Sequence, residues 1–325
     1  MKLGKQPLTL AALRKIAREG PQLELDPACL PALRAGFESV ERIVASGKPA
    51  YGINTGFGRL SQTRIPAEQL EQLQTNIVLS HAAGTGPLLD DAIVRLVLAL
   101  KVVGLAAGFS GVRPLLVERL LALYNAGIYP CIPAKGSVGA SGDLAPLAHL
   151  SLALLGIGNV RVGGKMLPAR EAIPEPIKLA PKEGLALLNG TQVSTALALN
   201  GLFSIEDVFS AAVAAGSLSV DAAAGSDTPF DARIHALRRQ AGQQEVARCY
   251  AALLEESEIR RSHLENDPRV QDPYSLRCQP QVMGACLDQM RYAARVFEIE
   301  AAAVTDNPLV FPDTDEILSG GNFHA

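Results

Sequence analysis

Residues 135–147 read Lys135-Gly136-Ser137-Val138-Gly139-Ala140-Ser141-Gly142-Asp143-Leu144-Ala145-Pro146-Leu147. At the centre of this run, the amide nitrogen of Gly142 can attack the carbonyl carbon of Ala140. Loss of two waters, one of them from the Ser141 side chain, would leave a five-membered methylidene-imidazolone. Gly142 has no Cβ, so its nitrogen can approach closely. The product is an electron sink that none of the twenty side chains offers, so these residues can supply an electrophilic cofactor.

The same residues also fit a glycine-rich turn before a helix. The glycines at 136, 139 and 142 are spaced GxxGxxG, which is neither the dinucleotide fingerprint nor a P-loop. Asp143 would then cap a helix that begins at Leu144. The tripeptide Ala-Ser-Gly is common, so it does not by itself separate the two interpretations.

The longer string of residues 136–147 distinguishes the cofactor-forming loop from the glycine-rich turn. Residues 136–147 resemble the signature of the aromatic amino acid ammonia-lyases, whose methylidene-imidazolone forms from Ala-Ser-Gly. Five further segments resemble blocks of this family, in the family's order: 51–58 (YGINTGFG), 79–84 (LSHAAG), 187–192 (LLNGTQ), 271–281 (QDPYSLRCQPQ) and 320–325 (GGNFHA). The resemblance spans nearly the whole chain.

The resemblance implies an enzyme, a carbon–nitrogen lyase that releases ammonia from an amino acid. Ser80-His81 resembles the histidine-specific form, whereas phenylalanine lyases have apolar residues at this pair. The implied reaction converts L-histidine to trans-urocanate, in histidine degradation. The implied cofactor is 4-methylidene-imidazol-5-one, formed autocatalytically from Ala140, Ser141 and Gly142, with no external cofactor. A tyrosine or phenylalanine ammonia-lyase, an aminomutase and a non-catalytic helical assembly protein stay open as alternatives.

Ammonia elimination also needs a positioned base, because the β-hydrogen of the substrate is barely acidic. The resemblance assigns this role to Tyr51 and makes Tyr274 a second catalytic residue. Arg277 is the implied clamp for the substrate carboxylate, since a planar guanidinium binds carboxylates bidentately. The other implied substrate contacts are His81, Asn189, Gln271 and Phe323. Taken singly, each of these residues also has an ordinary structural interpretation.

Spacing adds one expectation about the 271–281 segment. Gln271, Tyr274 and Arg277 are three positions apart, and Pro273 interrupts the segment. In a tight turn, positions three apart nearly eclipse one another. The three side chains are therefore predicted to point the same way.

Composition predicts a well-packed globular protein. Of 325 residues, 48% are hydrophobic and 19% charged, and the net charge of −3 gives no reason to expect nucleic acid or a membrane as partner. Five scattered cysteines in no CxxC or Cys/His cluster predict reduced thiols, no metal site and a cytoplasmic protein. The apolar stretches 96–109 and 193–224 carry charged residues and are predicted to be buried helices.

The chain is predicted to be mainly α-helical, a long-helix bundle with a smaller mixed N-terminal domain that bears the Ala-Ser-Gly loop. Residues 159–167 are predicted to form a hairpin, because Gly163-Gly164 separates two short strand-like runs. A boundary near Asn189 divides domain 1–190 from 191–325, the first part of the bundle. Caps, prolines and periodicity predict helices over 9–18, 27–45, 67–81, 91–107, 114–125, 144–155 and 280–306.

The resemblance also implies a homotetramer whose active sites are shared between subunits. The family chain continues beyond Ala325, so this sequence is expected to be a C-terminally truncated member. It would lack a glutamate that contacts the substrate imidazole and much of the bundle. A chain shortened in this way is expected to expose apolar surface and to associate. Whether it is active or an inactive fragment stays open.

Overall fold

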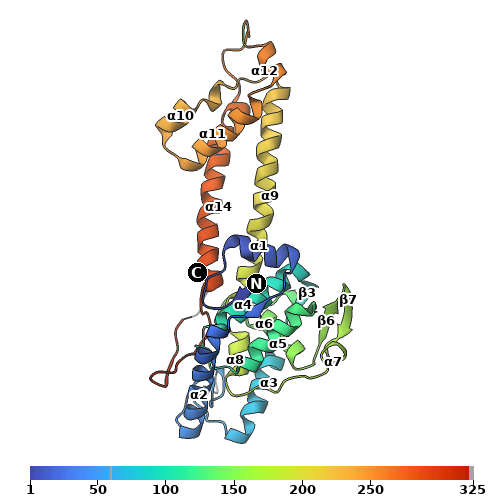
Figure 1. The fold of residues 1–325 in the computed structure, drawn as a ribbon, viewed down its shortest axis with the longest axis vertical. Coiled ribbons are helices and arrows are strands. Elements are labelled where there is room, and N and C mark those ends of the chain that lie inside the picture. The colour runs from blue at the N-terminus through green and yellow to red at the C-terminus, as the bar shows by residue number, and fades with distance from the viewer. Residues whose placement is uncertain (59–60, 322–325) are drawn as a thin grey trace. The chain divides into compact units, whose positions relative to one another are not determined.

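The computed structural model describes residues 1–58 and 61–321. Over these residues the protein is mainly α-helical, as predicted, with short two- and three-stranded sheets (Figure 1). The chain divides into two compact units. The larger unit contains Met1–Asn200 and the segment from Phe297 onward, and the smaller unit contains Gly201–Val296. The predicted division of the chain into an electrophile-bearing domain, 1–190, and a bundle domain, 191–325, stays a proposal.

The core of the larger unit is built around helix α4 (Asp91–Ala106). Between Ile93 and Ala106 every residue except Arg95 is buried, which confirms the predicted buried helix over 96–106, but the predicted stretch ran to 109 and Phe109 is exposed. Helices α1 (Leu10–Glu19), α2 (Leu30–Ser46) and α5 (Pro114–Asn125) pack against α4. A second group, α3 (Leu70–His81), α6 (Leu144–Leu154) and α8 (Glu183–Leu188), packs together. A short helix, α7, covers Ala169–Ala172.

The helix starts follow local sequence signals. The Oγ1 atom of Thr9 accepts a hydrogen bond from the nitrogen of Ala12 at 3.2 Å and caps α1, as predicted. Asp26 caps a 3₁₀ turn, Pro27–Cys29, that leads into α2. A second 3₁₀ turn, Ala67–Gln69, precedes α3. These interactions lie within a few residues along the chain, which is why sequence alone predicts them.

The predicted hairpin is confirmed as β6 (Asn159–Val162) and β7 (Lys165–Pro168). Strand β4 (Ile128–Pro130), which the sequence did not predict, pairs antiparallel with β6. The remaining sheets are small pairs that were also not predicted. They are β1 (Lys2–Leu3) with β2 (Glu24–Leu25), β3 (Thr85–Leu88) with β5 (Pro133–Lys135), and β8 (Leu309–Phe311) with β9 (Glu316–Leu318).

The smaller unit is helical. Its core is formed by Val213, Val220, Phe230, Val246, Tyr250 and Leu254. The Tyr250 hydroxyl donates a hydrogen bond to Oε1 of Gln279 at 3.0 Å, which satisfies the polar end of a buried ring. The unit contains a 3₁₀ turn (Thr228–Phe230), α10 (Ala232–Arg238), α11 (Ala241–Leu254), α12 (Glu258–Ser262), α13 (Tyr274–Arg277) and parts of α9 (Gln192–Ala222) and α14 (Gln279–Ala302).

Two helix predictions are wrong in part. The last helix was predicted to run from about 280 to Asp306, but α14 ends at Ala302, and Asp306 pairs with Lys182 beyond its end. The stretch 193–224 was predicted to be a buried helix; it forms helix α9, but only 28% of the most apolar 18 residues of α9 are buried. Helix α9 is long and apolar enough to cross a membrane, but one such helix among the described residues is weak evidence, since core helices pass the same test. Its exposed apolar side chains include Leu197, Ile205, Val208 and Leu218.

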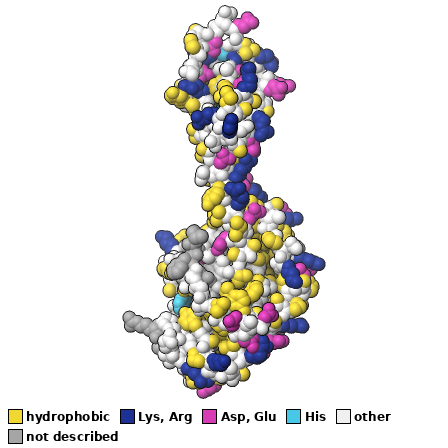
Figure 2. All heavy atoms as spheres, turned by 90° about the vertical axis from the view of Figure 1, so that its left-hand side faces the viewer, with side chains coloured by type: hydrophobic (Ala, Val, Ile, Leu, Met, Phe, Trp, Pro, Cys, Tyr) yellow, Lys and Arg dark blue, Asp and Glu magenta, His cyan; other side chains and the backbone are white. Residues whose placement is uncertain are grey.

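Charged side chains of both signs are mixed on the face that Figure 2 shows. Lys and Arg lie there among Asp and Glu, and among the described residues on that face neither sign gathers into one large patch (Figure 2). This distribution agrees with the mild net charge of −3. It gives no electrostatic reason for binding to a polyanion.

Candidate active site

The Ala140-Ser141-Gly142 tripeptide lies in the loop between β5 and α6. Ser141 has a φ of +59° and Gly142 a φ of +95°. A serine in the left-handed region is uncommon and persists where the surrounding structure holds it. The two successive positive φ values therefore mark a loop that is constrained at the residues whose cyclisation the sequence predicts.

Gly142 is held against the backbone of Gly190. The two residues form an isolated parallel bridge, and the nitrogen of Asp143 donates to the carbonyl oxygen of Gly190 at 2.8 Å. A Cβ at position 142 would clash with both the nitrogen and the oxygen of Gly190. Only glycine fits here, and the same lack of a side chain lets the Gly142 nitrogen approach the Ala140 carbonyl. The residues present therefore fit the formation of a methylidene-imidazolone.

Asp143 does not cap the helix that follows it. Its Oδ2 atom accepts hydrogen bonds from the nitrogen of Val193 at 3.0 Å and from the nitrogen and Oγ of Ser194 at 2.8 and 3.0 Å. The interpretation of Asp143 as the cap of α6 is thus wrong, since α6 has no side-chain cap. The pairing of Gly142 with Gly190 brings the start of α9 beside Asp143, where a carboxylate meets unpaired helical N–H groups.

Asn189 lies at a polar point inside the apolar core. Its side chain is 3% exposed, and Nδ2 donates to the carbonyl oxygen of Asn307. Its own carbonyl oxygen accepts a hydrogen bond from Nζ of Lys101 at 2.6 Å. Burial lowers the pKa of Lys101 to about 7, although the nearby Asp306 carboxylate acts in the opposite direction. Sequence analysis did not consider Lys101 for the site, although a lysine inside an apolar run was a visible signal.

Segment 51–58 packs beside α8, the helix that leads to Asn189. A Cβ on Gly52 would clash with Leu185 of α8. Gln74 of α3 joins both elements, because its Nε2 donates to the Gly52 carbonyl at 3.4 Å and its Oε1 accepts from the Leu185 nitrogen at 3.2 Å. Tyr51 is half-buried, in edge contact with Phe57 at 6.1 Å between ring centroids.

His81 is the last residue of α3. Its Nδ1 lies 2.9 Å from the carbonyl oxygen of Ile77 and 3.1 Å from Oγ of Ser80. A carbonyl oxygen can only accept, so Nδ1 carries the proton and Nε2 of the neutral ring is an acceptor. Three residues later, the nitrogen of Gly84 donates to Nε2 of His149 at 3.0 Å. A Cβ on Gly136 would come to 3.0 Å from the Cα of Gly84, so this segment borders the start of the loop that contains Ala140–Gly142.

The larger unit thus brings together four of the predicted blocks: 51–58, 79–84, 136–147 and 187–192. A cavity of about 380 Å³ adjoins the loop and is lined in part by Ser137, Gly139, Asp143 and Ser194. The block at 320–325 is described only to Gly321, whose neighbour Gly320 donates from its nitrogen to Oδ1 of Asn307 at 2.8 Å. Phe323 lies outside the described residues.

The block at 271–281 belongs to the smaller unit. The Arg277 guanidinium lies over the Tyr274 ring, 4.1 Å from its centroid, and its Nε donates to the carbonyl oxygen of Asp272 at 3.1 Å. Gln271 and Arg277 line a cavity of about 320 Å³ that Tyr274 does not line. The prediction of a common direction therefore holds for Tyr274 with Arg277. For Gln271 the structure shows only the cavity that it shares with Arg277.

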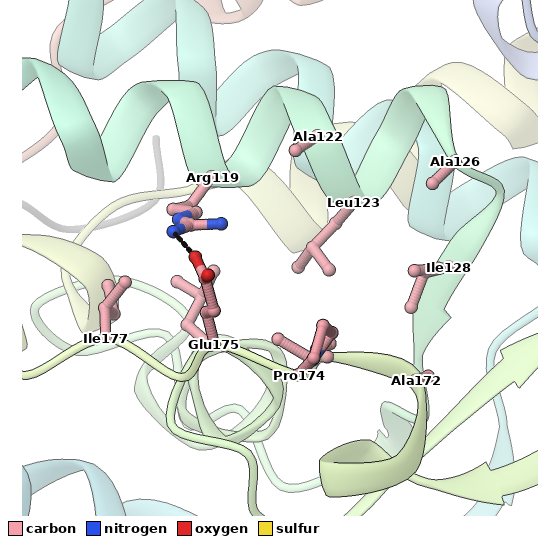
Figure 3. A pocket seen from close by; sticks show the side chains of 11 residues that line it. Arg119, Ala122, Leu123, Ala126, Ile128, Ala172, Pro174, Glu175 and Ile177 are labelled. Carbon is pink, nitrogen blue, oxygen red and sulfur yellow. Dashed lines mark hydrogen bonds and ion pairs between the residues drawn. The ribbon is translucent and has the colours of Figure 1, made fainter.

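A further cavity, of about 160 Å³, is lined by none of the predicted site residues. It lies between α5 and residues 172–177, with Leu123 and Pro174 in its wall, and Arg119 pairs with Glu175 at 2.9 Å beside it (Figure 3). Elsewhere among the described residues, no group of three or more His, Cys, Asp or Glu side chains is placed to hold a metal ion. The five cysteines carry free thiols.

The aromatic amino acid lyase family pattern matches residues 8–325. The chain belongs to the aromatic amino acid lyase family. This confirms the resemblance that the sequence blocks indicated, in a family that in general depends on a methylidene-imidazolone. The lyase chain is 65% identical over 322 residues to the histidine ammonia-lyase of Aromatoleum aromaticum and 60% identical to that of Burkholderia pseudomallei. These matches cover 98% of this chain but only 61% and 63% of the two relatives.

Solved structures agree with the assignment to this family. The phenylalanine aminomutase of Pantoea agglomerans matches the lyase chain with a TM-score of 0.91 at 29% identity, over all of this chain and 66% of its own. The histidine ammonia-lyase of Trypanosoma cruzi matches with a TM-score of 0.88 at 36% identity, over all of this chain and 61% of its own. The lyase chain thus has the mainly α-helical fold that the sequence predicted, over less than two thirds of the length of these relatives.

Proposed function

We propose that the protein to which this chain belongs is a histidine ammonia-lyase, which converts L-histidine to trans-urocanate and ammonia in histidine degradation. The observation that carries the proposal is the Ala140-Ser141-Gly142 loop, with Ser141 and Gly142 at positive φ and Gly142 against Gly190. The identity of 65% and 60% to relatives of that name supports the choice of substrate.

The electrophile for ammonia elimination is supplied by the methylidene-imidazolone that forms from these three residues. Tyr51 removes the β-proton of the substrate. Nε2 of His81 accepts a hydrogen bond from the substrate imidazole, because its Nδ1 proton is already used by the Ile77 carbonyl. Asn189 contacts the substrate amine or the ring formed from the loop.

The remaining substrate contacts are proposed to come from other subunits. Arg277 binds the substrate carboxylate, and its position over Tyr274 and against the Asp272 carbonyl limits its freedom before substrate arrives. Gln271 and Tyr274 accompany it, and Phe323 packs near the substrate ring. A homotetramer with shared active sites would join these residues to the loop, and the exposed apolar side chains of α9 support such an assembly. We place the protein in the cytoplasm.

The aminomutases among the structural matches support a second candidate, re-addition of ammonia at the β-carbon. Their identity of 29–33% is well below the 60–65% of the histidine ammonia-lyases, which favours simple elimination. The test is product analysis of the full-length protein with L-histidine, L-tyrosine and L-phenylalanine, with Ser141→Ala as control. Urocanate from L-histidine alone supports the proposal. A β-amino acid, or product only from the other two substrates, contradicts it.

A further inference from the structure

Lys101 is a buried lysine in α4, the helix around which the core of the larger unit is built. It is 2% exposed, and its neighbours along α4 from Leu96 to Ala106 are otherwise Ala, Val, Leu and Gly. Burial of an amine is costly unless the group is hydrogen-bonded. Packing alone therefore does not explain a lysine at this position, and its hydrogen-bond partner indicates what it does.

The nearby carboxylate of Asp306 is already paired. Lys182 contacts Oδ2 of Asp306 at 2.7 Å, with both side chains almost fully buried, and Oδ1 of Asp306 accepts from the nitrogen of Asn307 at 2.7 Å. The hydrogen bond from Lys101 goes instead to a neutral acceptor, the carbonyl oxygen of Asn189, at 2.6 Å. Lys101 thus holds a piece of backbone rather than completing an ion pair.

That backbone is the support on which Gly142 rests. Asn189 is fixed from two sides, at its carbonyl by Lys101 and at its side chain by the Asn307 carbonyl. The next residue, Gly190, contacts Gly142 so closely that no Cβ fits between them, and its carbonyl oxygen accepts from Asp143. A short chain of contacts therefore joins Nζ of Lys101 to the residue whose nitrogen must attack Ala140.

We infer that Lys101 is a positioning residue for cyclisation: it fixes the Asn189–Gly190 backbone against which Gly142 is held, and so sets the approach of the Gly142 nitrogen to the Ala140 carbonyl carbon. This inference rests on the proposed function. In the reaction, a bond forms between that nitrogen and that carbon. The Ala140 oxygen leaves as water with the amide hydrogens of Ser141 and Gly142. Oγ of Ser141 leaves as a second water with the hydroxyl and Cα hydrogens of that residue, so no oxidant is needed.

The test uses Lys101→Met in the full-length protein, because methionine keeps the length of the side chain but loses the donor. Two opposing effects on stability are expected, because the buried Asn189 carbonyl loses its donor while the cost of burying the amine is removed, so the urea midpoint of each variant is measured first. The readout is the mass of the peptide that contains Ala140–Gly142, taken from folded protein. We expect the fraction lacking two waters to fall by about tenfold or more, as for small misplacements of reacting groups. Lys165→Met, in the exposed β7 hairpin, is the matched control.

Lys101→Gln serves as the second variant, since its amide keeps an N–H donor without a charge. Partial recovery of the dehydrated fraction would support a role for the hydrogen bond itself. If Lys101→Met does not fold, the rate of dehydration in Lys101→Gln decides the matter by the same mass measurement. Full dehydration in the folded variants overturns only the role of Lys101 and leaves the proposed function intact. An unmodified wild-type protein contradicts the proposed function instead.

Discussion

The carboxylate of Asp143 accepts two hydrogen bonds from Ser194, one from its backbone nitrogen at 2.8 Å and one from its hydroxyl at 3.0 Å. The residue that follows the Ala140–Gly142 loop therefore caps α9, a helix that begins about fifty residues later in the chain. This contact fixes the loop from its C-terminal side, as the Gly142–Gly190 bridge does from within.

Asp143→Ala is expected to lower the free energy of unfolding by about 1–3 kcal/mol, because it leaves buried N–H groups of Val193 and Ser194 without their acceptor. Urea denaturation measures the change. Asp90→Ala is the matched control, since Asp90 precedes α4 without a side-chain cap. Equal losses in the two variants would contradict the capping role.

Gly142→Ala is expected to lower the free energy of unfolding by about 3 kcal/mol or more and to abolish dehydration of the loop. The added Cβ clashes with the Gly190 backbone, and a φ of +95° disfavours any side chain. Gly163→Ala is the control: its φ is also positive, at +56°, but nothing lies near its Cβ, so a loss of about 1 kcal/mol is expected. Chemical denaturation and peptide mass check both effects.

Lys101 is expected to make stability depend on pH above neutrality. Its pKa is about 7 when folded, against an ordinary 10.5, because burial disfavours the charge; Asp306 and Asp143 oppose this shift and Lys182 adds to it. Between these pH values the unfolded chain binds one more proton at this group. The free energy of unfolding of wild type should therefore rise with pH relative to Lys101→Met, by a few kcal/mol in total. Below pH 7 the difference in free energy of unfolding between wild type and Lys101→Met should be constant. Curves of the two proteins that stay parallel from pH 7 to 10 would contradict this account.

Arg277→Lys is expected to lower kcat/KM for L-histidine by about a hundredfold in the full-length protein. A lysine offers a point charge in place of the planar fork, and it loses the contact with the Tyr274 ring. Steady-state kinetics measure the effect, with Arg261→Lys at an exposed position as control. An unchanged kcat/KM would remove Arg277 from the substrate site.

The sequence predicted well the helix ends and turns that are decided by residues close together in the chain. Pro114 opens α5 and Asn125 ends it, and Gly163-Gly164 turns the β6–β7 hairpin, because caps, prolines and turns act over a few residues. The strands of the pairs β1–β2 and β3–β5 are only two to four residues long, too short for an alternating pattern. Their pairing depends on backbone brought together by the rest of the fold.

The candidate site was predictable where a block of sequence carries it and not where a distant contact does. The tripeptide Ala140-Ser141-Gly142 stands out in one stretch, but the acceptor for Lys101 lies 88 residues away along the chain. The capping of α9 by Asp143 likewise follows from the Gly142–Gly190 pairing, which no local pattern encodes. The exposure of the apolar surface of α9 could not be predicted either, because periodicity shows that a helix is apolar but not what covers it.

The most direct test of the central claim is the mass of the peptide that contains residues 136–147, from wild type and from Ser141→Ala. The account predicts that the wild-type peptide lacks two waters, and that the Ser141→Ala peptide does not, because the hydroxyl that leaves is absent. A wild-type peptide of full, unmodified mass in a folded, full-length protein would contradict it.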